Sequence, residues 1–460
     1  MREAYVRISF AFVIVLAVLH AAGALFMPCD YVWGLDILGY CRWWHVAAFA
    51  AVAIVTLCLR EPRAMALVEA ALSRWGKGLA ARAPRLGLPG LHAVLFAVSL
   101  AVLLLMRTKY SGGDSHWMHE TMPLCLKRAP LASAVLYALG WVGMACGLSY
   151  VTALQVAVSV VGALSVCVLF ALFARVVGER GRAALFLAAA LASYGVSRLL
   201  PGYIEVYSVY VLFLALYGWA LARYCLDGGG LLVLLGALAL ALFAHIQAVI
   251  LLPGSLLASV LVARARSRLG RAAAAWVVFA VAMVLTYPSL LPGLAELLPP
   301  GPAKSEFWSV RAHQPLFTPL STLLTARHWA DVANVHLLVS AVGLGLLAAG
   351  LAAWWPQRER DHFALVAAVH YALFALGTIV FHNFHHPIAR DWDMFGPGAV
   401  LLLVLAAALW RGQPREELRR AMVILLPLAA CITLLWLLQQ AGLTGIAPPP
   451  SDRVGYVLPG

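Results

Sequence analysis

The fold is decided by the segment from Tyr150 to Ala174, which reads YVTALQVAVSVVGALSVCVLFALFA. It contains no charged residue, and it is longer than the roughly 20 apolar residues that a helix needs to cross a bilayer core of about 30 Å. Similar runs recur along the 460-residue chain, which is 63% hydrophobic and 12% charged. Soluble domains are nearer half apolar and a quarter charged. Because a helix satisfies its own backbone polar groups in lipid, we predict an all-α, polytopic transmembrane helical bundle.

Thirteen apolar runs are expected to cross the membrane and to form one transmembrane domain over residues 1–440. An outer acidic loop is expected at 107–149, and it includes a helix at 131–147 that lies in the membrane interface. Residues 441–460 are expected to form a periplasmic tail. The predicted spans are 8–27, 44–60, 91–106, 150–174, 182–200, 204–223, 230–245, 247–263, 272–291, 334–354, 363–381, 396–410 and 421–438.

Basic residues are divided unevenly between the two faces that these spans define. With the N-terminus in the cytoplasm, the cytoplasmic segments hold 22 of the 33 Lys and Arg residues but only 9 of the 20 Asp and Glu residues. The whole net charge of +13 then lies on the cytoplasmic face, as the positive-inside rule requires. The sequence therefore predicts a multi-pass protein of the bacterial inner membrane, with a periplasmic C-terminus. Its basic character needs no nucleic-acid partner.

Reactive side chains gather in the predicted outer loops, first in the sequence GGDSHWMHE at residues 112–120. Two glycines allow a tight turn before Asp114. A helix that begins after Asp114 would place His116, His119 and Glu120 on one face. This arrangement suits a general base, a metal site or a sugar-binding surface. The alternative is a solvated loop in which Asp114 caps a helix.

A second group opens the predicted span 204–223, where the sequence LPGYIEVY carries Tyr203 and Glu205. The aromatic belt at the membrane surface would explain Tyr203. It does not explain Glu205, because a carboxylate at the edge of an apolar helix is costly unless it has a partner.

A third group is the sequence FHNFHHPIARDWDMF at residues 381–395, between two predicted spans. Histidine and aspartate are metal ligands, and arginine binds phosphate. Two further candidates are His245, at an outer turn between two spans, and the long outer loop 292–333 with Arg327. A loop of that length could cover a site, whereas a lone histidine is more often structural.

Together these features resemble the GT-C glycosyltransferases, membrane enzymes that take a sugar from a polyprenyl-phosphate carrier on the outer face. The resemblance covers roughly residues 91–410. Residues 113–115 are similar to the start of the acidic loop in protein O-mannosyltransferase-like members, and residues 202–205 and 390–395 resemble segments of bacterial members. Two differences stand out. Many members place the acidic loop after their first span, whereas here two further spans and a basic cytoplasmic segment come before it. Its two acids are also separated instead of adjacent.

The resemblance implies transfer of a sugar from a polyprenyl-phosphate donor to a periplasmic acceptor. Asp114 is then the expected base, with Glu120 and Glu205 as further catalytic carboxylates and Mg²⁺ or Mn²⁺ as a candidate cofactor. The expected substrate-binding residues are His116, His119, Tyr203, His245, Arg327, His382, His385, His386, Arg390, Asp391 and Asp393. Two alternatives stay open. One is a lipid or solute transporter, whose ionisable groups usually lie near the midplane, and the other is a non-catalytic subunit of a larger membrane assembly.

Overall fold

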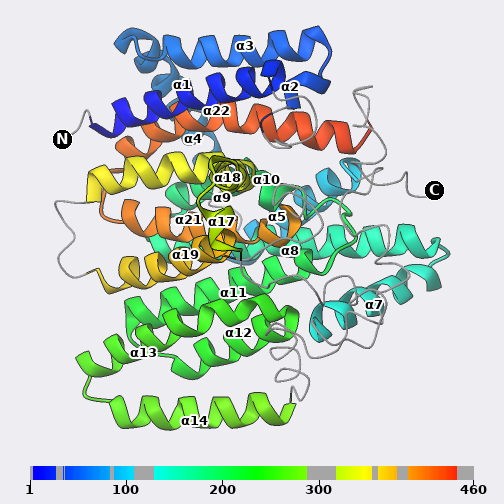
Figure 1. Cartoon of the computed structure of the whole chain (residues 1–460), viewed down its shortest axis with the longest axis vertical. Helices are drawn as coiled ribbons and strands as arrows, with labels where there is room; N and C mark the ends of the chain where they lie inside the picture. Colours follow the sequence, from blue (N-terminus) through cyan, green and yellow to red (C-terminus); the bar gives the residue numbers. More distant parts are fainter. Residues whose placement is uncertain are drawn as a thin grey trace.

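The computed structural model describes residues 4–26, 35, 37–82, 87–107, 129–286, 318–354, 361–380 and 392–442. Within these residues the chain forms helices and contains no strand. Figure 1 shows most of the longer helices side by side, with their axes nearly parallel. The predicted all-α class is therefore confirmed for the part of the chain that the structure describes.

Nine of the described elements are long and apolar enough to cross a bilayer. The chain is thus a multi-pass membrane protein built from helices. These elements are α1 (Ala4–Phe26), α5 (Leu88–Leu105), α8 (Tyr150–Val177), α11 (Val206–Asp227), the 3-10 turn η2 (Ile246–Leu251) with α13 (Leu252–Ala265), α14 (Leu269–Thr286), α18 (Ala326–Trp354), α19 (His362–Val380) and α22 (Arg415–Gln440).

The other predicted spans form shorter or bent elements, so the total of thirteen crossings stays a prediction. Helices of 13 or 14 residues are about 20 Å long, which is less than the thickness of the bilayer core. The first part of α4 meets α3 at a bend of 105°. These predicted spans correspond to α3 (Trp43–Cys58), α9 (Arg180–Leu191) with α10 (Tyr194–Ser197), α12 (Leu231–Ala244) and α21 (Gly398–Trp410). Helix α4 (Pro62–Arg82) follows α3 and covers the segment predicted to be cytoplasmic. Short helices α2 (Ile37–Tyr40), α17 (Leu320–Leu323) and α20 (Trp392–Phe395) complete the described elements discussed below.

Helix α21 lies in the interior of the bundle and is buried along its entire length. It packs against α8, α18 and α19, which belong to distant parts of the sequence. Its last residue, Trp410, is fully buried, and the indole N–H donates to the Leu346 carbonyl at 3.0 Å. By contrast, the apolar side chains of α5 and α14 stay largely exposed. An apolar surface of this kind is what a lipid-facing helix presents.

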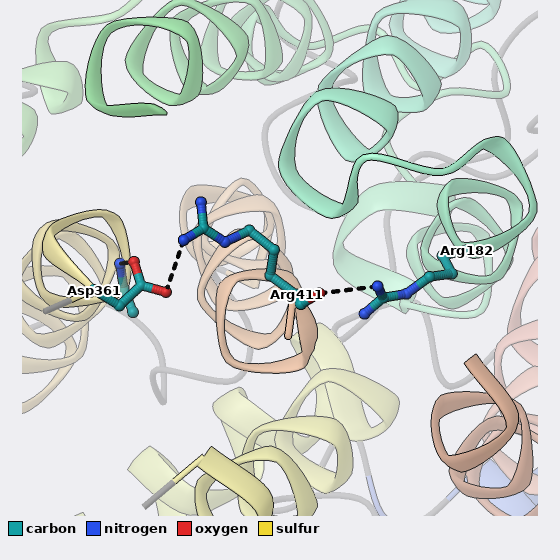
Figure 2. Close-up of polar contacts among 4 residues, drawn as sticks. Arg182, Asp361 and Arg411 are labelled. Atoms are coloured by element: carbon teal, nitrogen blue, oxygen red, sulfur yellow. Dashed lines mark hydrogen bonds and ion pairs between the residues drawn. The ribbon is translucent and has the colours of Figure 1, made fainter. Parts of the chain in front are cut away.

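One end of the bundle, called here the basic end, is held together by arginines. Arg411 at the end of α21 pairs with Asp361 before α19 at 3.3 Å, and Arg182 of α9 donates to the Arg411 carbonyl at 2.9 Å (Figure 2). Arg415 of α22 pairs with Glu179 at 2.9 Å. The sequence assigns these arginines to the cytoplasmic face. In the structure, the helix ends that carry them lie at the same end of the bundle.

The described ends of the predicted outer segments, among them Glu205, lie at the opposite end, called here the Glu205 end. Glu205 directly precedes α11, whose last residue, Asp227, pairs with Arg175 at the end of α8. A helix of 22 residues is about 33 Å long, so Glu205 lies about that far from this ion pair. Figure 1 likewise shows the start of α1 and the end of α22 at opposite ends of the bundle.

The helix expected in the outer interface is α7 (Pro130–Ala145), which packs on the first turns of α8. Gly143 permits this approach, because a Cβ there would lie 2.7 Å from the Cβ of Ala153. Tyr137 and Trp141 lie one turn apart and are 49% and 58% exposed. Exposed aromatic side chains on one helix face suit the headgroup region. The position of α7 relative to the membrane stays a prediction.

A buried polar network joins α11, α13 and α19 inside the bundle. Tyr217 Oη lies 2.6 Å from both His370 Nε2 and Ser255 Oγ, and all three side chains are fully buried. His370 Nδ1 donates to the Val366 carbonyl at 2.8 Å, so Nε2 is the acceptor for the tyrosine hydroxyl. His370 lies in the middle of α19, so one titratable side chain lies inside the bundle, away from the helix ends.

Replacing Gly254 by alanine is expected to lower the thermal stability of the protein. The added Cβ would lie 2.3 Å from Cε1 of His370, whose ring cannot retreat without losing its hydrogen bonds. Overpacking a core costs about 1–3 kcal/mol. Gly236→Ala in α12 is the matched control, because among the described residues no heavy atom outside its own helical turn lies within 4 Å of the added Cβ. It is expected to be neutral or stabilising. Equal melting temperatures of the two variants in one detergent would contradict the tight packing at Gly254.

Candidate functional site

The segment between α10 and α11, residues 198–205, forms the base of the candidate site. Gly202 has φ +72°, a left-handed conformation that favours glycine. A Cβ there would also lie 2.8 Å from Cγ of Arg107, the residue that leads from α5 towards the acidic loop. Tyr203 is fully buried, and the Arg198 guanidinium covers its ring at 4.5 Å. Tyr203 therefore belongs to the packed interior, where a cation–π contact holds it.

Glu205 is buried at the N-terminus of α11 and caps that helix. Its Oε2 accepts a hydrogen bond from the Val206 N–H at 3.0 Å, and its carbonyl accepts one from the Ser208 hydroxyl at 2.8 Å. The N-terminus of a long helix stabilises negative charge. The N-terminus of α11 is therefore one of the partners that a buried carboxylate needs. An ionised Glu205 can accept a proton or bind a cation.

His245 lies between α12 and η2, with its ring against two tyrosines of α11. The ring centroids lie 4.8 Å from that of Tyr207 and 5.5 Å from that of Tyr210. Its Nδ1 accepts a hydrogen bond from the Gln247 backbone N–H at 3.1 Å. The proton of the neutral ring is therefore on Nε2. The packing and this hydrogen bond together fix the orientation of a histidine N–H donor.

The turn that carries His245 also holds the third predicted segment. Gln247 Nε2 donates to the Met394 carbonyl of α20 at 2.8 Å. On the other side, Gly195 of α10 approaches the chain just after α20, where a Cβ on Gly195 would lie 2.8 Å from the Gly396 carbonyl oxygen. The end of the RDWDMF sequence is therefore held between η2 and α10.

We call Arg107, Glu205, Tyr207, His245 and Met394 the Glu205 cluster. These residues come from the stem of the acidic loop, the start of α11, the α12–η2 turn and α20. Direct contacts connect the four elements: Gly202 with Arg107, Tyr207 with His245, and Gln247 with Met394. Segments that are far apart in the sequence thus meet at the Glu205 end.

Most of the side chains that the sequence predicts to do chemistry lie outside the described residues. The structure therefore does not test whether they surround one cavity. They are Asp114, His116, His119, Glu120, His382, His385, His386, Arg390, Asp391 and the side chain of Asp393. Of the other predicted residues, Glu205, Tyr203 and His245 lie at the Glu205 end, while Arg327 is exposed on the first turn of α18.

A metal site within the described part of the chain would need a group of His, Cys, Asp or Glu side chains. No three such residues come together there. The donors that suit Mg²⁺ or Mn²⁺ are carboxylate oxygens. In the predicted site these belong to Asp114, Glu120, Glu205, Asp391 and Asp393, of which only Glu205 has a described side chain, so the metal stays a prediction.

Sequence reasoning missed the residues that fix the site in place, namely Arg107, Arg198 and Gln247. Gln247 leaves one signal in the sequence: it is a polar residue two positions after His245, within an otherwise apolar stretch. Arg107 and Arg198 leave none, because each acts through a contact with a segment distant in the sequence.

Comparison with known proteins identifies no relative of the chain. No family model, no curated protein and no solved structure matches it. A relation to the GT-C glycosyltransferases therefore rests on the sequence motifs, and a function has to be argued from the residues and their arrangement.

Proposed function

We propose that the protein is a GT-C-type glycosyltransferase of the bacterial inner membrane. It moves a sugar from a polyprenyl-phosphate carrier to an acceptor on the periplasmic side. The observation that carries this proposal is the Glu205 cluster, in which contacts connect the anchors of three motif-bearing segments at one end of the bundle. Two anchors meet directly, and the third is connected through the turn that carries His245. An active site requires such convergence of a base, a binding group and an orienting group.

In the proposed reaction, the bond between the sugar C1 and the carrier phosphate oxygen breaks, and the electron pair leaves with the phosphate. A phosphate needs stabilisation of its charge more than a general acid. Arg390 supplies it as a two-pronged clamp. It lies two residues before α20, whose Met394 is held by Gln247. The Nε2–H of His245 adds a neutral donor near the same element.

The acceptor hydroxyl attacks the sugar carbon and loses its proton to Asp114, the proposed general base. Glu205, stabilised as an anion by the α11 N-terminus, orients the acceptor or binds a cation. A bound Mg²⁺ or Mn²⁺ would neutralise the phosphate charge, with Asp114, Asp391 and Asp393 as its ligands.

The test is a transfer assay with the purified protein in lipid nanodiscs. A panel of polyprenyl phosphates carrying labelled sugars is supplied, together with a membrane extract as acceptor and either Mg²⁺ or Mn²⁺. Release of label from at least one carrier is the expected result. Failure with every donor and both metals would favour the non-catalytic subunit.

A transporter is the second candidate, and the mid-helix His370 is the observation that favours it. A transporter would move labelled lipid across sealed vesicles without cleaving it, and loss of the His370 imidazole would stop that movement. In the proposed enzyme His370 is structural, so His370→Gln is expected to lower stability before it changes turnover.

Topology gives a separate prediction. Alkaline phosphatase, which is active only in the periplasm, is expected to be active when fused after Gln440. The same reporter fused after Arg268, at the basic end, is the control and is expected to be inactive, because the whole net charge of +13 lies on the predicted cytoplasmic face. A green fluorescent protein that fluoresces at Gln440, with an inactive phosphatase there, would overturn this orientation.

A further inference from the structure

A cavity of about 660 Å³ opens at the basic end between α1, α4 and α22. One part of its lining is apolar and is formed mainly by side chains of α1 and α4. The other part is charged and contains three arginines and one glutamate. The apolar lining includes Val6, Phe10, Ile14 and Met65, and the charged lining is Arg7, Arg60, Glu69 and Arg420.

The floor of this cavity is fixed by an ion pair between two elements. Arg420 of α22 contacts Glu69 of α4 at 2.6 Å. Helix α4 turns away from α3 by 105°, and it carries exposed Arg63 and Arg74 as well as the half-buried Met65. Apolar and basic side chains on one helix, together with this change of direction, are typical of a helix that lies in the headgroup plane of a membrane.

Charge decides which kind of molecule fits. The lining holds three arginines and one glutamate, so it carries a net positive charge. Arginine binds phosphate oxygens with two parallel hydrogen bonds. The apolar lining beside them suits an acyl chain, so the cavity combines the two features that a phospholipid needs.

We propose that this cavity binds one anionic glycerophospholipid. Arg7 and Arg60 contact its phosphate, and an acyl chain lies along Phe10 and Ile14. Given the proposed topology, the lipid belongs to the cytoplasmic leaflet. Its site lies at the opposite end of the bundle from the Glu205 cluster, so the proposal does not depend on sugar transfer.

The test measures lipid binding to the purified protein in a neutral detergent at about 0.15 M salt, where attraction to a charged surface is screened beyond about 8 Å. Native mass spectrometry counts bound phosphatidylglycerol and phosphatidylcholine. Preference for phosphatidylglycerol is expected. The double variant R7Q/R60Q is expected to bind it about 30-fold more weakly, since each basic residue near a lipid phosphate contributes about 1 kcal/mol.

The double variant R63Q/R74Q is the matched control. It removes the same charge from exposed positions of α4 outside the cavity, and it is expected to keep wild-type binding. Ala66→Trp provides a second route, because it fills the cavity while both arginines remain. Ala66→Trp is expected to abolish lipid binding. If R7Q/R60Q does not fold, the result for Ala66→Trp tests whether the lipid binds in this cavity.

Three outcomes would overturn the proposal. Equal losses in R7Q/R60Q and R63Q/R74Q would indicate diffuse electrostatic attraction. Equal binding of phosphatidylglycerol and phosphatidylcholine would exclude recognition of the anionic headgroup. Displacement of the lipid by soluble glycerol 1-phosphate at the same concentration would indicate a small-anion site instead.

Discussion

Replacing Asp114 by asparagine is expected to lower the rate of sugar transfer by about 10²- to 10⁴-fold while folding and donor binding stay nearly unchanged. Asparagine keeps the shape of the side chain but loses its basicity and most of its affinity for a metal. In the proposed reaction the acceptor hydroxyl then has no group that takes its proton. The measurement is kcat with a polyprenyl-phosphate sugar, alongside the dissociation constant of the donor and the melting temperature.

The control for this variant is Glu61→Gln, the same chemical change at an exposed acid between α3 and α4. It is expected to transfer sugar at the wild-type rate. A folded Asp114→Asn protein with normal turnover would remove Asp114 from catalysis. Glu120→Gln then becomes the decisive variant, because Glu120 is the other carboxylate of the same loop.

Much of the helical framework follows from hydropathy alone. The predicted span 150–174 corresponds to α8, which ends at Val177, and the predicted turn after residue 245 corresponds to the junction of α12 and η2. These boundaries are predictable because a charge or a polar turn ends each apolar run. Local composition is then enough to place them.

Hydropathy fails where a tertiary contact breaks a helix. Residues 182–200 read as one apolar span, yet the helix ends before Ser193 and restarts as α10. Ser193 Oγ lies 2.6 Å from Ser340 Oγ, and Ser340 has non-helical backbone angles inside α18. Two helices are thus interrupted where their serines meet. Neither serine indicates this in its own sequence neighbourhood.

In the candidate site, too, the local sequence predicts some features and tertiary contacts determine the others. Glu205 and His245 stand out in the sequence because polar side chains at the ends of apolar helices need partners. Their partners could not be predicted. The sequence indicates only that Glu205 needs a partner. The structure supplies the N-terminus of α11 itself, and His245 is oriented by Tyr207, Tyr210 and Gln247. Which segments touch depends on how the helices pack.

Replacing Arg390 by alanine is expected to lower kcat/KM for the donor by about 30- to 4,000-fold, because truncating one partner of a desolvated charge pair costs about 2–5 kcal/mol. A phosphate clamp acts in both the ground state and the transition state, so KM for the donor should rise and kcat should fall. This distinguishes Arg390 from Asp114, for which only kcat changes. Arg390→Lys keeps the charge but not the two-pronged geometry, and an intermediate loss is expected.

The structure adds a second variant to this experiment. Gln247 holds α20, two residues beyond Arg390, through its hydrogen bond to the Met394 carbonyl. Gln247→Ala frees that element without removing a charge, so a smaller rise in the donor KM is expected, with nearly normal stability. If Arg390→Ala instead lowered kcat and left donor affinity at the wild-type value, Arg390 would act on the transition state alone. The binding clamp would then be wrong.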